Sequence, residues 1–137
     1  MTRKLEPRLR ILILWAFVIP AGFTCKFYQG PLGFWVRNYA AGLLYEVFWI
    51  LGFFLLFPKR ELIGRLSLWV FVLTSFLELL QLYQTPWIEK LREPFLGKVL
   101  LGTTFSWWDF PHYAAGCLLA VWLLERAASE GDTAGIL

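Results

Sequence analysis

The sequence predicts an all-α integral membrane protein, a bundle of four transmembrane helices that forms a single domain over residues 1–137. Of these residues, 58% are apolar and 17% are charged, whereas soluble domains average about 45 to 50% apolar and about 25% charged. Four stretches of at least 15 residues carry at most one formal charge each, so the chain can cross a bilayer repeatedly. This composition excludes an ordinary soluble enzyme, and 13 basic against 10 acidic residues do not indicate a nucleic-acid partner.

The first transmembrane helix is expected near residues 9–26. An uncharged stretch lies between Arg10 and Lys26, and Pro20 is expected to bend this helix, since membrane helices tolerate proline. A short apolar stretch after a basic start also fits a cleaved signal peptide. Whether the first helix is retained therefore stays open.

Three further transmembrane helices are expected near residues 39–57, 64–83 and 109–126. In each of these apolar stretches a single acidic residue stands out: Glu46, Glu78 and Asp109. Lys and Arg residues are more frequent at the termini and in the loop after the second helix than in the other two loops. The positive-inside rule then places both termini in the cytoplasm and the protein in the inner membrane.

The segment 84–108 between the third and fourth helices is itself apolar and is interrupted by proline and glycine residues. Thr85-Pro86 is typical of a helix start, and an apolar stripe follows at Trp87, Ile88, Leu91 and Phe95. Such a stripe predicts a short interfacial helix. The part after Pro94 is expected either to lie along the membrane or to re-enter it.

The three acidic residues within the apolar stretches predict a polar cluster in one leaflet. An ionisable residue inside a membrane helix costs at least about 2.5 to 3.5 kcal/mol, so each needs a role. With alternating crossings, the start of the second helix, the end of the third and the start of the fourth face the same side. Helical spacing adds neighbours to Glu78 and Asp109 on the same faces. The candidate ligand-binding residues are Glu46, Glu78, Gln81, Arg92, Asp109, His112 and Tyr113.

Three functions remain open for this cluster. The first is a pocket that binds or transports the headgroup of a lipid or envelope precursor, with Arg92 contacting phosphate or carboxylate. Alternatively, it is a packing device that fixes the helices or a partner subunit. The third alternative is an intramembrane enzyme with Asp109 or His112 as base, although no activated nucleophile identifies catalytic residues. No cofactor fingerprint or metal-ligand spacing occurs, so we expect no cofactor and no metal, membrane lipids as partners, and an enzyme only as the weakest alternative.

The segment from residue 78 to 116 resembles a small bacterial membrane-protein family of unknown function that is similar to the VanZ-like superfamily. VanZ-like proteins carry a Glu-x-x-Gln pair late in one helix, an Arg in the following segment, and an Asp that opens the next helix with Asn four and Gly seven residues later. The matching residues here are Glu78, Gln81, Arg92, Asp109 and Gly116, and Tyr113 stands at the Asn position. The residues that carry the likeness to the small family are Glu78-Leu-Leu-Gln81-Leu-Tyr83, Pro86-Trp87, Leu91-Arg92, Gly97, Leu101-Gly102, Phe105, Trp108-Asp109, Tyr113 and Gly116.

The resemblance covers roughly residues 38 to 124 and implies a bacterial multi-pass inner-membrane protein. VanZ-like proteins are associated with the cell envelope and with glycopeptide (teicoplanin) resistance. No chemistry is carried over from them, and the ligand and the oligomeric state stay open.

Overall fold

The computed structural model describes residues 7–82, 85–101 and 106–134, and all regular secondary structure within these ranges is helical. The prediction of an all-α fold is therefore confirmed for the described residues. In chain order the elements are α1 (Pro7–Phe27), α2 (Gly33–Trp35), the π-helical turn η1 (Val36–Ala40), α3 (Ala41–Leu56), the 3-10 turn η2 (Arg60–Leu62), α4 (Ile63–Leu80), α5 (Pro86–Arg92), α6 (Phe95–Leu101) and α7 (Asp109–Ala134).

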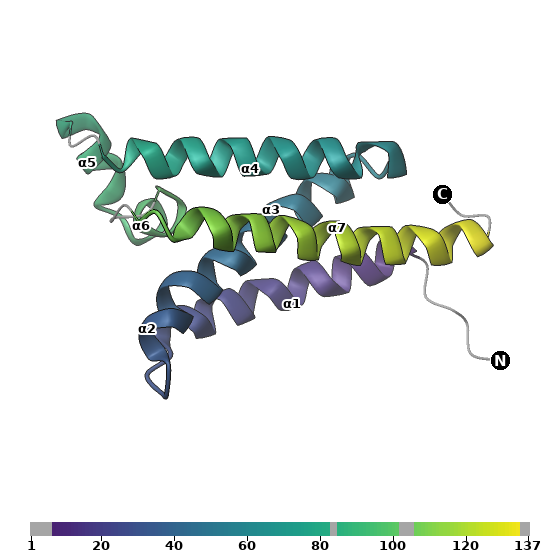
Figure 1. The fold of residues 1–137 in the computed structure, drawn as a ribbon, viewed down its shortest axis with the longest axis horizontal. Coiled ribbons are helices and arrows are strands. Elements are labelled where there is room, and N and C mark those ends of the chain that lie inside the picture. The colour runs from purple at the N-terminus through teal and green to yellow at the C-terminus, as the bar shows by residue number, and fades with distance from the viewer. Residues whose placement is uncertain (1–6, 83–84, 102–105, 135–137) are drawn as a thin grey trace.

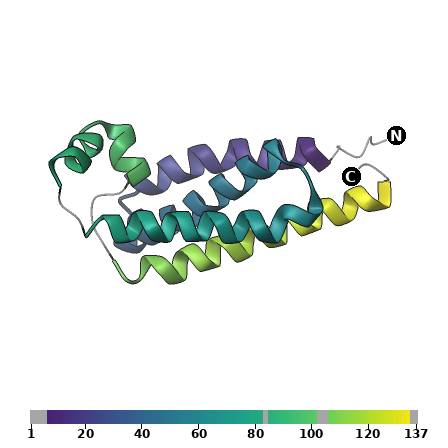
Figure 2. The ribbon, with the colours of Figure 1, turned by 90° about the horizontal axis from the view of Figure 1, so that it is seen from above.

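The body of the molecule consists of the long helices α1, α3, α4 and α7 (Figure 1). Helix α7 packs against both α3 and α4, and α1 packs against α3. Figures 1 and 2 place the start of α1 and the end of α7 at one end of the bundle, whereas α2, α5 and α6 lie at the opposite end. An even number of lengthwise helices returns the chain to the side from which it began.

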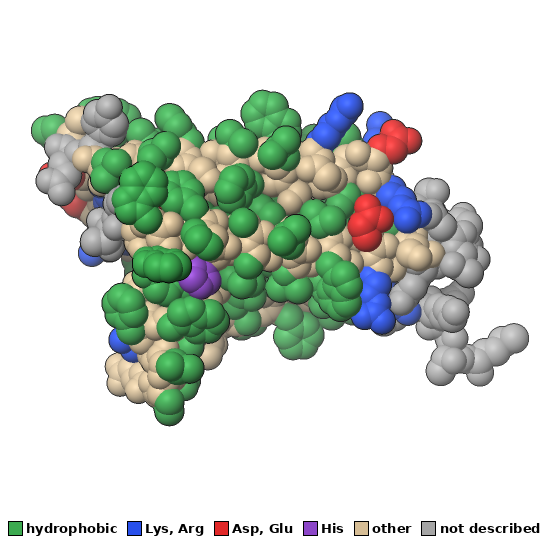
Figure 3. Space-filling view, viewed as in Figure 1, with side chains coloured by type: hydrophobic (Ala, Val, Ile, Leu, Met, Phe, Trp, Pro, Cys, Tyr) green, Lys and Arg blue, Asp and Glu red, His purple; other side chains and the backbone are tan. Residues whose placement is uncertain are grey.

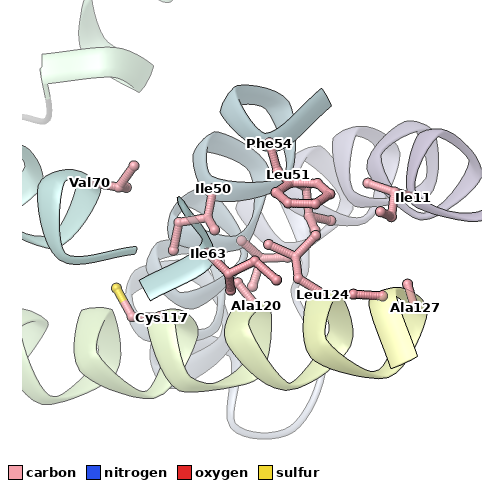
Figure 4. Packing of buried hydrophobic residues seen from close by; sticks show 12 residues of the cluster. Ile11, Ile50, Leu51, Phe54, Ile63, Val70, Cys117, Ala120, Leu124 and Ala127 are labelled. Atoms are coloured by element: carbon pink, nitrogen blue, oxygen red, sulfur yellow. The ribbon is translucent and has the colours of Figure 1, made fainter. Parts of the chain in front are cut away.

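The apolar core lies between α1, α3, α4 and α7 (Figure 4). Helix α3 contributes large side chains, among them Ile50, Leu51 and Phe54, which are fully buried. The facing side of α7 is lined with small residues such as Ala120. A Cβ atom added at Gly116 would lie 2.6 Å from the Leu43 carbonyl oxygen. Small residues therefore let α7 approach the α3 backbone closely, as in other membrane bundles.

Within the described residues, three helical units are long and apolar enough to cross a membrane: Arg8–Phe27, Gly33–Leu56 and Arg60–Leu80. The outer surface is apolar as well, since large side chains such as Phe17, Leu68 and Leu118 are exposed. On the face shown in Figure 3, hydrophobic side chains cover the length of the bundle and charged side chains gather toward its ends. This distribution identifies a membrane protein.

The second helical unit begins at Gly33, six residues before the expected start at 39. Leu32 precedes it with a φ of 58°, a left-handed conformation that is uncommon for a residue with a side chain. The expectation of a later start rested on Arg37 and Asn38, which are polar. The structure accommodates Arg37 because its guanidinium donates a hydrogen bond to the Tyr28 carbonyl oxygen at 2.7 Å.

The segment between α4 and α7 contains two short helices. Helix α5 begins at Pro86 after an extended Thr85, as the sequence indicates, and the break before α6 falls at Glu93-Pro94. Within the predicted apolar stripe, Ile88 is buried and Trp87, Leu91 and Phe95 are exposed, because only one side of α5 meets the end of α4. Residues 84 and 102–105 of the predicted interfacial or re-entrant segment lie outside the described residues.

Candidate functional site

A cavity of about 660 Å³ lies at the end of the bundle that carries α2, α5 and α6. Its walls come from α1, the unit Gly33–Leu56, α4, α6 and the start of α7. Such a volume is typical of small-molecule sites. Polar side chains line part of it and hydrocarbon side chains line the rest. The polar lining includes Lys26, Asn38, Thr74, Glu78, Gln81, Lys98, Ser106, Asp109 and Tyr113.

Glu78 lies at the centre of the polar lining. Its carboxyl group is 1% exposed, and one oxygen, Oε1, accepts a hydrogen bond from the Ser106 backbone N–H at 2.9 Å. The other oxygen, Oε2, accepts from the Tyr113 hydroxyl at 3.1 Å and from the Gln81 amide at 3.2 Å. These three donors from α4, α7 and the segment before α7 compensate the cost of burying the carboxylate.

Asp109 lies beside Glu78 at the first residue of α7. The two carboxyl groups repel each other, and the Lys26 ammonium attracts Asp109 from α1. The structure therefore brings together four of the residues expected at the site, namely Glu78, Gln81, Asp109 and Tyr113. They meet because the last turn of α4 packs beside the first turn of α7.

Glu46 occupies a separate position, in the contact between α3, α4 and α7 rather than in the cavity lining. Its side chain is fully buried. The Cys117 thiol donates to Oε2 at 3.3 Å, whereas the Thr74 hydroxyl donates to backbone carbonyl oxygens of its own helix α4. Oε1 has no hydrogen-bond partner among the described residues.

Arg92 also lies apart from the cavity. One of its guanidinium nitrogens, Nη2, donates to the Leu80 carbonyl oxygen at 3.4 Å, and its side chain lines a small crevice between α4 and α5. Arg92 thus closes the end of α4, whose last carbonyl groups lack partners within the helix. The expected contact between Arg92 and a ligand in the cavity has no support in this geometry.

His112 faces an aromatic cluster rather than Asp109. Its Nε2 atom accepts a hydrogen bond from the indole N–H of Trp35 at 3.1 Å, because indole nitrogen is a donor only. Its Nδ1 atom is 2.7 Å from the Trp108 carbonyl oxygen and therefore carries the ring proton. The imidazole also stacks on Tyr39, with ring centroids 4.6 Å apart. This neutral tautomer fastens α2 and η1 to α7.

Residues 32–117 match a family described as "Protein of unknown function (DUF2809)". The match covers more than half of the chain. The chain belongs to this family. No curated protein and no solved structure matches it.

The DUF2809 match contains the whole carboxyl cluster and most of the cavity wall, since only the lining residues from α1 precede Leu32. Residues Tyr83, Gly102 and Phe105 of the motifs quoted above fall outside the described residues. Gly97 belongs to a close contact within this DUF2809 protein, because an added Cβ would lie against the Leu91 carbonyl oxygen.

Several lining residues of the DUF2809 cavity were not among the sequence candidates. In the sequence, Lys26 only marks the end of the first apolar stretch, and Lys98 is one of several cations between the third and fourth expected helices. Asn38 and Tyr39 gave no sequence signal, because the π-helical turn η1 decides which way they point. Both lysines fall in segments predicted to lie on the outer side of the membrane. Counting the cations of those segments would have identified them, but it would not have related either lysine to a cavity.

Proposed function

We propose that this DUF2809 protein crosses the bacterial cytoplasmic membrane four times, through α1, Gly33–Leu56, α4 and α7. Helix α7 has 26 residues and spans about 39 Å at about 1.5 Å per residue, which exceeds the hydrocarbon thickness of a bilayer. Its hydropathy is lowered by polar residues near its ends, such as His112 and Glu125. The excess of Lys and Arg at the end that holds α1's start supports cytoplasmic termini.

The proposed activity is to bind or transport a membrane lipid or a lipid-linked envelope precursor. The observation that carries this proposal is the cavity itself, which joins a hydrogen-bonded carboxyl cluster around Glu78 to a wall of hydrocarbon side chains. An amphipathic molecule matches such a lining, with its headgroup at the polar part and its chain along the apolar part. In the proposed orientation the cavity lies in the outer half of the bundle.

The resemblance of residues 78–116 to VanZ-like proteins supports a role in the cell envelope. Three of the residues that carry it, Glu78, Gln81 and Asp109, lie in the cavity lining. Arg92 and Gly116 have positions that support the ends and packing of helices instead. The resemblance therefore points to the same end of the bundle as the cavity does.

Filling the cavity tests the proposal. Gly22 lines the cavity, and a Cβ atom added there has nothing within 4 Å. The leucine side chain of Gly22→Leu should therefore fill part of the cavity without moving neighbouring protein atoms. We expect Gly22→Leu to weaken binding of a pyrene-tailed phospholipid by about tenfold, equivalent to about 1.4 kcal/mol. Binding is measured in detergent by energy transfer from tryptophan to pyrene.

Gly64→Leu is the matched control, because Gly64 is an exposed helical glycine that also has nothing within 4 Å of an added Cβ. This variant should bind the phospholipid like the parent protein, and both variants should melt at the parent temperature. Equal binding by all three proteins would contradict the cavity as the lipid site.

A structural or interaction role is the second candidate, and the position of Glu46 favours it. This carboxyl group is fully buried between three helices and does not line the cavity. Buried polar groups of this kind can fix how helices pack. If filling the cavity leaves lipid binding unchanged, this packing role becomes the better account of the polar residues.

A further inference from the structure

Four charged side chains line the cavity, two carboxyl groups and two lysines. Lys26 comes from the last turn of α1 and Lys98 from α6, so the two ammonium groups belong to different walls. The carboxyl groups belong to Glu78 and Asp109, at the end of α4 and the start of α7. The charge that the lining presents to a ligand depends on how these four groups are already neutralised.

The protein compensates the two carboxyl groups to different extents. The charge of Glu78 is stabilised by the Ser106 N–H, the Gln81 amide and the Tyr113 hydroxyl, all of which donate to it. Asp109 lies beside Glu78 and is attracted by the Lys26 ammonium. Glu78 is thus saturated by the protein's own donors, whereas Asp109 faces the lysines.

The two lysines are not saturated in this way. Neither Lys26 nor Lys98 lies within 4 Å of a carboxylate oxygen in residues 7–82, 85–101 and 106–134, although Lys26 attracts Asp109 through space. Both side chains are exposed at the cavity. Because Glu78 is compensated by its own donors, two ammonium groups face the single carboxylate of Asp109, which leaves an excess of one positive charge.

Hydrocarbon side chains adjoin these lysines. Val18 and Phe23 lie one to two turns before Lys26 on α1, and Leu96 lies two residues before Lys98 on α6; all three line the cavity. A molecule with its anionic group between the two lysines would therefore place an attached chain along Val18 and Phe23. The lining combines the charge and the apolar surface that an anionic amphiphile needs.

We propose that Lys26 and Lys98 select a ligand with a phosphate-ester headgroup of net negative charge on an apolar tail. This rests on the proposed function, since it assumes that the cavity holds an amphiphile. A single phosphodiester charge would neutralise the lining, whereas a zwitterionic headgroup would bring a second cation into it. Ammonium groups bind phosphate oxygens through charge-assisted hydrogen bonds.

The test compares pyrene-tailed phosphatidylglycerol with phosphatidylcholine of the same chains, using the full-length protein in a neutral detergent. We expect phosphatidylglycerol to bind about tenfold more tightly, and Lys26→Gln or Lys98→Gln to reduce that preference by about fivefold each. Affinity for phosphatidylcholine should not fall in either variant. The preference should also decline with added salt, because exposed charges are screened.

Lys90→Gln is the matched control, because Lys90 is an exposed lysine of the neighbouring α5 that does not line the cavity. It removes the same charge and should keep the preference. Competition by a polyprenyl phosphate distinguishes the two sources of the headgroup. Displacement of phosphatidylglycerol by the polyprenyl compound at lower concentration than by unlabelled phosphatidylglycerol would support the phosphate site and assign it to a lipid-linked precursor.

If the two phospholipids bind equally and Gly22→Leu weakens the binding of both, the headgroup selection is overturned and the proposed function stands. An equal loss of preference in Lys90→Gln would also overturn it, since general surface charge would then explain the effect. Binding that does not respond to Gly22→Leu would overturn both the selection and the lipid cavity.

Discussion

Glu78 and Glu46 are both buried carboxyl groups, but they accept hydrogen bonds from different numbers of donors. Glu78 accepts hydrogen bonds from three donors, whereas Glu46 accepts one, from the Cys117 thiol, within the described part of the chain. The sequence predicts both as interior acids, because a charge within an apolar helix is costly. It does not predict which of them reaches the cavity. That depends on how the helices are rotated against one another, and Gly116 permits the close approach of α7 to α3 beside Glu46.

Gly116→Ala should destabilise the protein by about 1 to 3 kcal/mol, the usual cost of overpacking. The added methyl group would lie 2.6 Å from the Leu43 carbonyl oxygen and 2.8 Å from the Cβ atom of Glu46, so α3 and α7 must separate. Thermal melting in detergent measures the change. Gly64→Ala is the control and should melt at the same or a slightly higher temperature, since alanine favours helix. Equal melting of both variants would contradict the close contact.

Helices α5 and α6 pack mainly against each other and less against the long helices of the bundle. The sequence predicts the start of α5 through Pro86, and the lack of a backbone N–H at Pro94 accounts for the break before α6. The exposed stripe could not be predicted, because a periodic apolar pattern does not reveal whether protein or lipid will cover it. In the structure Phe95 stacks on Phe23 and Phe27 of α1, with ring centroids 6.2 and 6.5 Å apart.

Phe95→Ala should loosen α6 without loosening the core. Aromatic pairs contribute about 0.5 to 1.5 kcal/mol each beyond their buried area, so losing both pairs should make the α6 amides exchange with deuterium about tenfold faster or more. Amides of α3 and α7 should keep their exchange rates. Hydrogen exchange read by mass spectrometry checks this. Phe76→Ala removes an exposed phenylalanine from α4 and serves as the control. Unchanged exchange in α6 would show that the stack does not hold this helix.

The whole molecule shows how far composition determines a fold. A chain with 58% apolar residues has too little polar surface for water, so the prediction of membrane helices follows directly. The cavity does not follow, because its lining comes from five segments whose relative positions no local pattern specifies. Lys26 and Lys98 illustrate this limit, since 72 residues separate them in the sequence.

The proposed four crossings place the start of α4 and helix α5 on opposite sides of the membrane. We expect Gly64→Cys to react with a membrane-impermeant maleimide only after the cells are permeabilised, and Trp87→Cys to react in intact cells. Both positions are exposed. The variants are made with Cys25→Ser, while Cys117 is buried. Reaction of both positions from one face would refute the four crossings, and the reversed pattern would refute only the orientation.

Helix α1 contributes a large part of the cavity wall and little of the buried core. Among the described residues of α1, Ile11 is the one with a fully buried side chain, whereas Val18, Phe23 and Lys26 line the cavity. Helix α1 also precedes the segment that the DUF2809 match covers. Helix α1 also packs on α3, where the Trp15 indole N–H donates to the Phe48 carbonyl oxygen at 3.1 Å, so its cavity-lining positions have a different role from its packing positions. Substitutions at the cavity-lining positions of α1 would change the proposed ligand preference while leaving the packing of α3, α4 and α7 in place.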